Sequence, residues 1–289
     1  MGLRPRLALW WALLPAEFRR WVRPWYVAYA ILGAMASGLE VILIPAAVAR
    51  DGGTSAQIGL VVAMINIGVL ASPLWGLIAE RQHAHRVVFF CGFALAGAGF
   101  LGFALGDGVI VWMICAFLIG LGVGAANTMA GLFVVAFTPQ KEWNRRIGWM
   151  QIFNATGQIC GLLVAGMFLP RHGMLIAAAL IIPALIFGRY GLPAGVSRSS
   201  GDAPSAAATR QPIGLADGWR YLAALRTAFF TRFTVFLLGW FIIVAATALL
   251  YALYPVLMLK VFGISVAAGA TLYAVAATLR VPLYGLAGR

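Results

Sequence analysis

The chain has 289 residues, of which 63% are hydrophobic and only 10% are charged. Soluble globular domains average about 45–50% apolar and about 25% charged residues, so this composition excludes an ordinary soluble enzyme, a disordered chain and a disulfide scaffold. Seven stretches contain no Asp, Glu, Lys or Arg, and most reach the roughly 20 residues of a membrane-crossing helix: 52–79, 87–106, 108–140, 147–170, 172–188, 233–259 and 261–279. The sequence therefore predicts an all-α, polytopic membrane protein.

Basic residues are unevenly distributed around eight predicted spans: 25–48, 57–79, 87–106, 109–135, 147–169, 173–192, 230–257 and 265–286. With the N-terminus in the cytoplasm, 17 basic residues lie inside, three lie outside and Arg280 lies within a span. This excess of inside Lys and Arg predicts a cytoplasmic N-terminus. The net charge of +13 is then a sign of topology and of attraction to anionic membrane lipid, and we expect no nucleic-acid partner.

Composition divides the chain into four regions. Residues 1–24 are rich in Trp and Arg and predict an interfacial amphipathic segment. Residues 25–192 hold six closely spaced spans, which predict a six-helix bundle. Residues 193–228 are rich in Ala, Ser, Gly and Pro, which is typical of a flexible linker. Residues 229–289 hold two further spans.

Glu40 is the only acidic residue inside any predicted span. An ionised carboxylate at such a depth costs roughly 2.5–3.5 kcal/mol on insertion scales, so we expect Glu40 to be neutral or to face a water-filled cavity. In a regular α-helix, Tyr29, Ser37 and Glu40 share one face. Glu40 is therefore interpreted as a proton-coupling or cation-binding carboxylate, and the alternative is a structural carboxylate bonded to a neighbouring helix.

The loop between spans 2 and 3 contains a glycine and several charges. Gly76 is expected to allow two helices to approach closely. Glu80 and Arg81 lie where the second span leaves the bilayer, and Arg86 follows them. A carboxylate there can pair with a basic residue or cap a helix, and contacts of this kind form in one conformation and break in another. The loop is interpreted as a gate, and the alternative is a solvated turn.

Three further features are the glycines of span 5, an arginine in span 8 and the cysteines. Gly157, Gly161 and Gly166 give span 5 a small-residue surface for helix packing. Arg280 lies about two turns from the inner end of span 8, where it either snorkels to the headgroups or faces the cavity and meets an anionic group. The three cysteines lie in different spans, and no disulfide, metal site, cofactor or catalytic set is predicted: Cys91, Cys115 and Cys160.

An internal repeat links the two parts of the chain. Around the outer ends of spans 1 and 7, five residues recur at an offset of 210, from Pro45 and Pro255 to Gly59 and Gly269. The inner ends of spans 2 and 8 match at an offset of 209, as 73–77 and 282–286. The second hairpin is therefore predicted to begin a second copy of the first half, related to it by an axis along the membrane normal.

The loop between spans 2 and 3 resembles the signature loop of the major facilitator superfamily, Gly-x-Leu-Ala-Asp-Arg-x-Gly-Arg-Lys. Gly76, Ala79 and Arg81 match it directly, and Glu80 is a conservative replacement for its Asp. His83 stands where the family usually has Gly. Span 5 is similar to the family's antiporter motif, but Leu162 replaces the Pro of that motif, so symport, antiport and uniport all stay open.

This resemblance implies a six-helix N-terminal bundle followed by the first two helices of a C-terminal bundle. Family members have twelve spans, so we expect a truncated chain. Spans 1, 4 and 7 line the family's central cavity, which adds Asn127, Thr247 and Tyr251 to the candidate cavity residues.

The resemblance also implies a function. We expect a secondary active transporter of a small molecule, working by alternating access and coupled to a proton. The alternative is a non-transporting membrane scaffold or sensor with the same fold. The ratio of 19 Arg to two Lys is typical of a GC-rich bacterial genome, so the expected location is a bacterial inner membrane.

Overall fold

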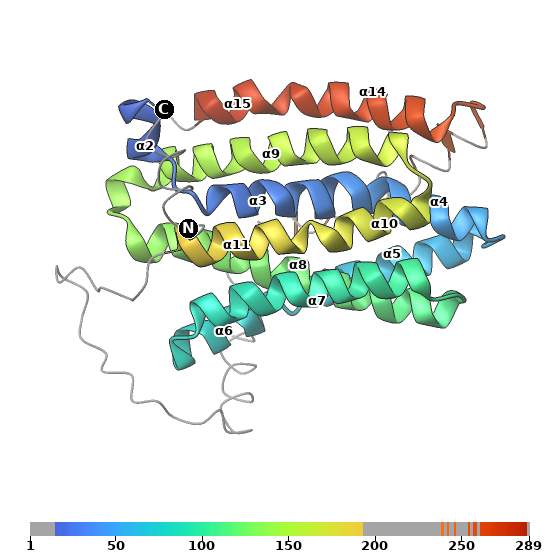
Figure 1. Ribbon diagram of the computed structural model, residues 1–289, viewed down its shortest axis with the longest axis horizontal. Coiled ribbons are helices and arrows are strands. Elements are labelled where there is room, and N and C mark those ends of the chain that lie inside the picture. The colour runs from blue at the N-terminus through green and yellow to red at the C-terminus, as the bar shows by residue number, and fades with distance from the viewer. Residues whose placement is uncertain are drawn as a thin grey trace, which may run out of the picture.

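The computed structural model describes residues 15–192 and 261–287, together with seven single residues between them: Leu238, Gly239, Ile242, Ala246, Tyr254, Leu257 and Met258. Every regular element of the two long described ranges is a helix, and none is a strand. The helices lie side by side along one axis (Figure 1). The predicted all-α fold is confirmed.

The elements follow the predicted spans closely. Those of the first three spans, with the short helix that precedes them, are α2 (Ala16–Trp21), α3 (Tyr26–Leu32), the π-helix η1 (Gly33–Leu39), α4 (Glu40–Arg50), α5 (Ser55–Val69), α6 (Ser72–Gln82) and α7 (His85–Leu105). Those of the later spans are α8 (Val109–Phe137), the 3-10 helix η2 (Gln140–Glu142), α9 (Trp143–Met167), α10 (Pro170–Ala179), α11 (Ile181–Gly191), α14 (Val266–Thr278) and α15 (Arg280–Ala287).

Six helices in the described residues are long and apolar enough to cross a membrane: 26–50, 55–82, 85–105, 109–137, 170–191 and 266–286. They correspond to predicted spans 1, 2, 3, 4, 6 and 8. The fifth predicted span is α9, a helix of 25 residues with a more polar sequence that includes Arg145, Arg146 and Asn154. The seventh predicted span and the linker at 193–228 fall almost entirely outside the described residues, and so do residues 1–14 of the N-terminal segment.

Prolines set the positions at which three of the spans break into two helices. A proline clashes with the carbonyl group four residues before it and donates no hydrogen bond to that group. Pro73, Pro183 and Pro282 lie four residues after the last residues of α5, α10 and α14, respectively. The breaks in spans 2 and 8 are 209 residues apart, which is the offset of the repeat at the inner ends of these spans.

The helix starts of the two repeated hairpins are also alike. The Thr54 side chain accepts a hydrogen bond from the Gln57 amide, and the Gln57 side chain accepts one from the Thr54 amide, which forms a capping box at the start of α5. The Ser265 side chain accepts a hydrogen bond from the Ala268 amide at the start of α14. The predicted offset pairs Ser265 with Ser55, whereas the capping residue of the first hairpin is Thr54. The helix starts are therefore displaced by one residue from that alignment.

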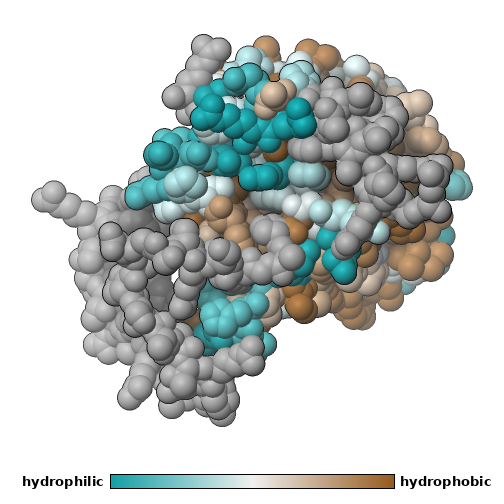
Figure 2. Space-filling model, turned by 60° about the vertical axis from the view of Figure 1, so that its left-hand side comes forward, coloured by the Kyte–Doolittle hydropathy of each residue, from teal (hydrophilic) through white to brown (hydrophobic). Residues whose placement is uncertain are grey.

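The bundle has two chemically different ends. We call the end that carries α2 the α2 end and the opposite end the Arg171 end. At the Arg171 end, the guanidinium of Arg171 forms ion pairs with Asp51, at 3.4 Å, and with Asp107. These pairs join the loops that follow spans 1, 3 and 5. Figure 2 looks toward the α2 end, where hydrophilic residues gather, while hydrophobic residues cover much of the flank.

Helix α9 occupies the position that organises the candidate site. One of its sides packs against span 1, and another packs against α14 and α15 (Figure 1). The apolar core consists of two clusters of buried side chains, one toward each end of the bundle. One cluster centres on Leu39 and Phe100, and the other on Tyr26 and Phe133. Because α9 is more polar than its neighbours, its side chains supply hydrogen bonds to span 1 at the level between these clusters.

Candidate functional site

Glu40 lies where the first span changes from a π-helix to an α-helix. Its amide N–H donates to the carbonyl of Met35, five residues earlier, which is the π-helical pattern. Its side chain is partly buried, and the buried Oε2 atom accepts no hydrogen bond from any residue that the structure describes. Short π-helices inside α-helices frequently occur at functional sites. The lone intramembrane carboxyl is thus placed beside an irregular turn without a donor for one of its oxygens.

The π-helix changes one sequence-based prediction. The shared face of Tyr29, Ser37 and Glu40 assumed a regular α-helix, whereas the seven π-helical residues of η1 shift the register between Tyr29 and Glu40. Tyr29 is 3% exposed and points toward span 4, while Ser37 and Glu40 stay partly exposed. The three side chains therefore do not form one continuous face, and that prediction is wrong for Tyr29.

Span 5 holds the π-helix in place through its backbone and two amide side chains. Asn154 Nδ2 donates to the Tyr29 carbonyl at 3.4 Å, and Gln158 Nε2 donates to the Ser37 carbonyl at 3.3 Å. A Cβ atom at Gly157 would overlap the Ala30 carbonyl. These hydrogen bonds and the near-absence of side chains between the helices fix spans 1 and 5 to each other.

The other packing glycines differ in their partners. A Cβ atom at Gly161 would overlap the Ala34 carbonyl of span 1. A Cβ atom at Gly166 would instead lie 3.3 Å from Ala267 Cα, in α14. Gly157 and Gly161 therefore face span 1, whereas Gly166 faces span 8.

A cluster of polar side chains joins four spans near the α2 end. The Tyr29 hydroxyl donates to Asn127 Oδ1 of span 4 at 2.7 Å. The same hydroxyl interacts with Gln151 of span 5 and lies within electrostatic range of Tyr284 of span 8. Two predicted cavity residues, Tyr29 and Asn127, are thus brought together. Gln151 and Tyr284 were missed as polar partners, and no pattern in the sequence marks them.

Two other predicted cavity residues, Thr247 and Tyr251, lie outside the described residues. Arg280 is the first residue of α15, at the break in span 8, and it is partly buried. Tyr284 is one helical turn further along the same helix. The break therefore places Arg280 at the start of the helix that carries Tyr284 into the polar cluster.

The loop predicted as a gate has two parts with different roles in this conformation. Arg86 donates to the carbonyls of Arg189 and Leu192 at 3.3 and 3.2 Å, and so it caps the end of span 6. Glu80 is exposed. A Cβ atom at Gly76 would meet only Thr128 Cγ2, at 3.8 Å, which is an ordinary contact. The close approach predicted at Gly76 is therefore not present here.

A buried arginine at the α2 end was also missed by the sequence analysis. Arg146 is 7% exposed, pairs with Glu142 at 2.8 Å and donates to the carbonyls of Arg20 and Trp21. It therefore attaches α2 to the start of α9. In the sequence, Arg146 was counted only as one of the 17 basic residues on the cytoplasmic side.

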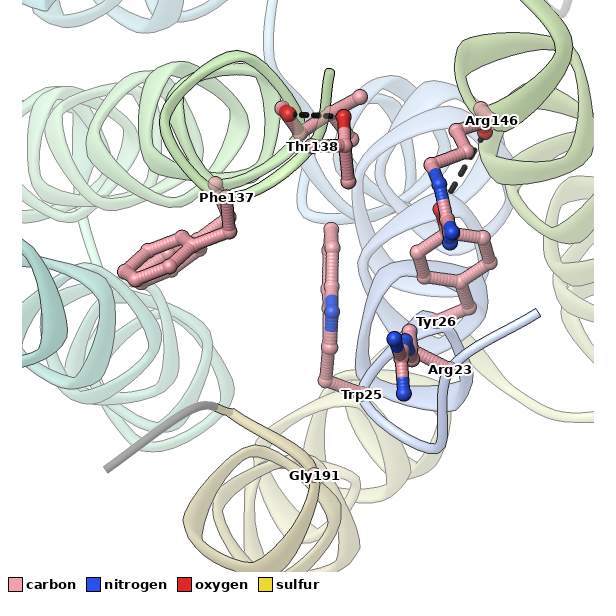
Figure 3. A pocket seen from close by; sticks show the side chains of 9 residues that line it. Arg23, Trp25, Tyr26, Phe137, Thr138, Arg146 and Gly191 are labelled. Atoms are coloured by element: carbon pink, nitrogen blue, oxygen red, sulfur yellow. Dashed lines mark hydrogen bonds between the residues drawn. The ribbon is translucent and has the colours of Figure 1, made fainter. Parts of the chain in front are cut away.

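A pocket of about 260 Å³ lies beside this arginine (Figure 3). The Tyr26 hydroxyl donates to the Arg146 carbonyl at 3.4 Å, and the Trp25 ring lies between Tyr26 and Phe137. Arg23 is exposed at the same pocket. Among the described residues, no group of three or more His, Cys, Asp or Glu side chains could hold a metal ion.

The contact between spans 5 and 8 is bordered by a cavity at each end of the bundle. The cavity at the Arg171 end has a volume of about 520 Å³ and is lined by residues that include Gly166 and Val266. At the Arg171 end, a Cβ atom at Gly166 would lie 3.3–3.4 Å from Ala267 and Ala270. At the α2 end, the same helices border an open cavity of about 500 Å³, whose lining includes Arg145 and Tyr284. Tyr284, which interacts electrostatically with Tyr29, therefore also lines this cavity.

Comparison with known proteins identifies one family. The sequence model of the Major Facilitator Superfamily matches residues 25–289. No curated protein matches the chain. The match covers all the described spans, from the start of α3 to the end of α15.

Proposed function

Because the chain belongs to the major facilitator superfamily, we propose that it is a secondary active transporter in which Glu40 couples the movement of a small molecule to that of a proton. A membrane transporter of the major facilitator kind follows from the family itself. The coupling is supported by one observation above all, which is the intramembrane carboxyl of Glu40, whose buried Oε2 accepts no hydrogen bond from the described residues.

We further propose that the α2 end faces the cytoplasm, in a bacterial inner membrane. Within residues 15–192, nine basic residues lie at this end and two, Arg50 and Arg171, lie at the other. Cytoplasmic segments are enriched in Lys and Arg, so this distribution supports the orientation. The cavity between α9 and α15 then opens toward the cytoplasm.

The unpartnered carboxyl gives a physical route to coupling. A charged Glu40 is costly in an apolar, closed bundle, whereas a neutral Glu40 is not. When the central cavity of the transporter opens to one side of the membrane, water can solvate the Glu40 carboxylate and the proton can leave. When the bundle closes, a proton must return before Glu40 is enclosed. Proton binding and alternating access are thereby linked, because each conformation favours a different form of the same group.

The substrate is proposed to bind between Glu40 and the polar cluster. Tyr29 and Glu40 are eleven residues apart on span 1, or about 16 Å along a helix. The hydroxyls of Tyr29 and Tyr284 and the amides of Asn127 and Gln151 offer donors and acceptors from both halves of the protein. A site shared by both halves can change its exposure as the halves rock against each other.

The test is a flux measurement on the purified protein in proteoliposomes that contain a pH-sensitive dye. A small-molecule library is first screened for compounds that raise the unfolding temperature, and those compounds are then tested for uptake driven by a pH gradient. Glu40→Gln keeps the shape of the neutral side chain. We expect this variant to lose gradient-driven accumulation and the accompanying dye signal, while exchange of substrate across the membrane persists.

Glu17→Gln is the matched control, because it makes the same chemical change in an exposed carboxyl of α2. It should transport as the unmodified protein does. If Glu40→Gln kept normal gradient-driven accumulation, Glu40 would be structural. If the unmodified protein moved none of the stabilising compounds, a scaffold or sensor would be the better interpretation.

A further inference from the structure

The cavity between spans 5 and 8 combines an apolar interior with a charge at its mouth. Its walls include Trp149 and Ile152 of α9 and Leu286 of α15. Gly285 leaves room between the helices, since a Cβ atom there would meet only Ile152, at 3.9 Å. Arg145 is the one charged residue among the residues that line the cavity. A cavity of this kind suits an elongated apolar group that ends in an anion.

Arg145 is positioned for such an anion, unlike its neighbour Arg146. Arg146 is buried and neutralised by Glu142 at 2.8 Å. Arg145 is exposed, and it forms no ion pair or hydrogen bond through its side chain within the described part of the chain. Its guanidinium stacks on the Trp21 ring, 4.0 Å from the ring centroid, which leaves the edge of the guanidinium available.

Helix α2 places the ring of Trp21 against Arg145. The Nε1 atom of Trp21 is buried and has no acceptor among the described residues. Arg146 holds α2 against α9 by donating to the carbonyls of Arg20 and Trp21. The stacked pair of Trp21 and Arg145 is therefore fixed at the level where an amphipathic segment meets the headgroup region of a bilayer.

We propose that this cavity is a binding site for an anionic phospholipid of the cytoplasmic leaflet, with the lipid phosphate on Arg145 and one acyl chain along Trp149, Ile152 and Leu286. The proposal uses the orientation given under the proposed function, in which the α2 end is cytoplasmic. Anionic lipids are attracted to basic residues at this surface. A free phosphate would satisfy Arg145 but leave the apolar walls uncovered, so the lipid is the occupant that fits both parts.

The site belongs to the conformation described here. Span 8 contacts span 5 through both α14 and α15, and the cavity lies beside this contact at the α2 end. Closing the α2 end would bring Leu286 toward α9 and remove the space for an acyl chain. An occupied site therefore favours the conformation that is open at the α2 end.

The test uses the full chain in phosphatidylcholine nanodiscs that contain a phosphatidylglycerol with a photoactivatable group in its acyl chain. After illumination, labelled peptides are mapped by mass spectrometry. We expect label on the peptides that carry Trp149, Ile152 and Leu286. Arg145→Gln should lower this labelling about fivefold, which is the effect of removing roughly one charge contact with an anionic surface. Lys141→Gln removes an exposed cation one turn earlier in the chain, outside the cavity lining, and should leave the labelling unchanged.

Competition identifies the occupant. Unlabelled phosphatidylglycerol should reduce the labelling, whereas additional phosphatidylcholine and soluble glycerol phosphate should not. Equal labelling of the Arg145→Gln and Lys141→Gln variants, or no label on these peptides, would overturn the site. Competition by glycerol phosphate would overturn the lipid as the occupant. Because labelling requires no transport, a failure of the Glu40 experiment would leave this result interpretable.

Discussion

Helix α9 contacts span 1 on one side and span 8 on another, and the two contacts are built differently. Toward span 1, Gly157 leaves no room for a side chain, and Gln158 donates a hydrogen bond to a backbone carbonyl. Toward span 8, a Cβ atom at Gly166 would lie 3.3 Å from Ala267 at the Arg171 end, and a cavity of about 500 Å³ lies beside the contact at the α2 end.

The difference indicates which contact can open. Separating α9 from span 1 would leave backbone and amide groups without partners in an apolar environment, which is unfavourable. Separating α9 from span 8 at its tight end would mainly part small apolar surfaces, which lipid tails can cover. We therefore interpret the first contact as fixed within a bundle and the second as the movable contact between the two halves.

The strongest test of the fixed contact is Gly157→Ala. Its new Cβ atom would overlap the Ala30 carbonyl, so the backbones must separate. We expect a loss of about 3 kcal/mol in the free energy of unfolding, measured by denaturant titration in detergent. Gly131→Ala is the matched control, because no atom lies within 4 Å of its Cβ position. Equal stability of the two variants would contradict a fixed contact.

A smaller effect is expected for Gln158→Leu. This change removes the hydrogen bond to the Ser37 carbonyl and keeps a side chain of similar size. The free energy of unfolding should fall by about 1 kcal/mol, the typical contribution of one hydrogen bond. Thr156→Val serves as the control, since Thr156 bonds only to the Ile152 carbonyl of its own helix. If both substitutions cost the same, the amide would not contribute to the contact between the spans.

The smallest effect on stability is expected at the movable contact, for Gly166→Ala. The added Cβ atom would lie 3.3–3.4 Å from Ala267 and Ala270, so α14 needs to shift by only a few tenths of an ångström. The free energy of unfolding should change by less than about 0.5 kcal/mol. Substrate exchange in proteoliposomes should nevertheless slow about twofold, because the conformation closed at the Arg171 end is disfavoured by about 0.4 kcal/mol. A stability loss as large as that of Gly157→Ala would show that both contacts are fixed.

Sequence reasoning recovered the fold because lipid imposes a simple rule on it. A span must be a helix with few charges, so uncharged stretches predicted α7 and α8 closely. Glu40 was identified because it breaks this rule: it is an acidic residue inside a predicted span. The family resemblance carried by the loop between spans 2 and 3 is confirmed by the match over residues 25–289.

The details of the site depended on information that local patterns do not contain. The hydrogen bond between Tyr29 and Asn127 joins residues 98 positions apart. The sequence of the π-helix, from Gly33 to Leu39, has no proline, and its two glycines do not specify a π-helix, so a regular α-helix was expected there. Arg146 is buried by α2, a contact between distant segments, whereas its sequence neighbourhood resembles that of exposed Arg145.

The π-helix also makes the number of residues in span 1 important. A ring closed between residues five apart holds one residue more than the ring of an α-helix. Span 1 therefore behaves as a helix with a single inserted residue, and its two segments, α3 and α4, are rotated relative to each other by that insertion. Removal of one residue between Gly33 and Leu39 would thus turn α4, and Glu40 with it, about the helix axis relative to Tyr29 of α3. In this span, the direction in which the carboxyl points is set by the number of residues as well as by their identity.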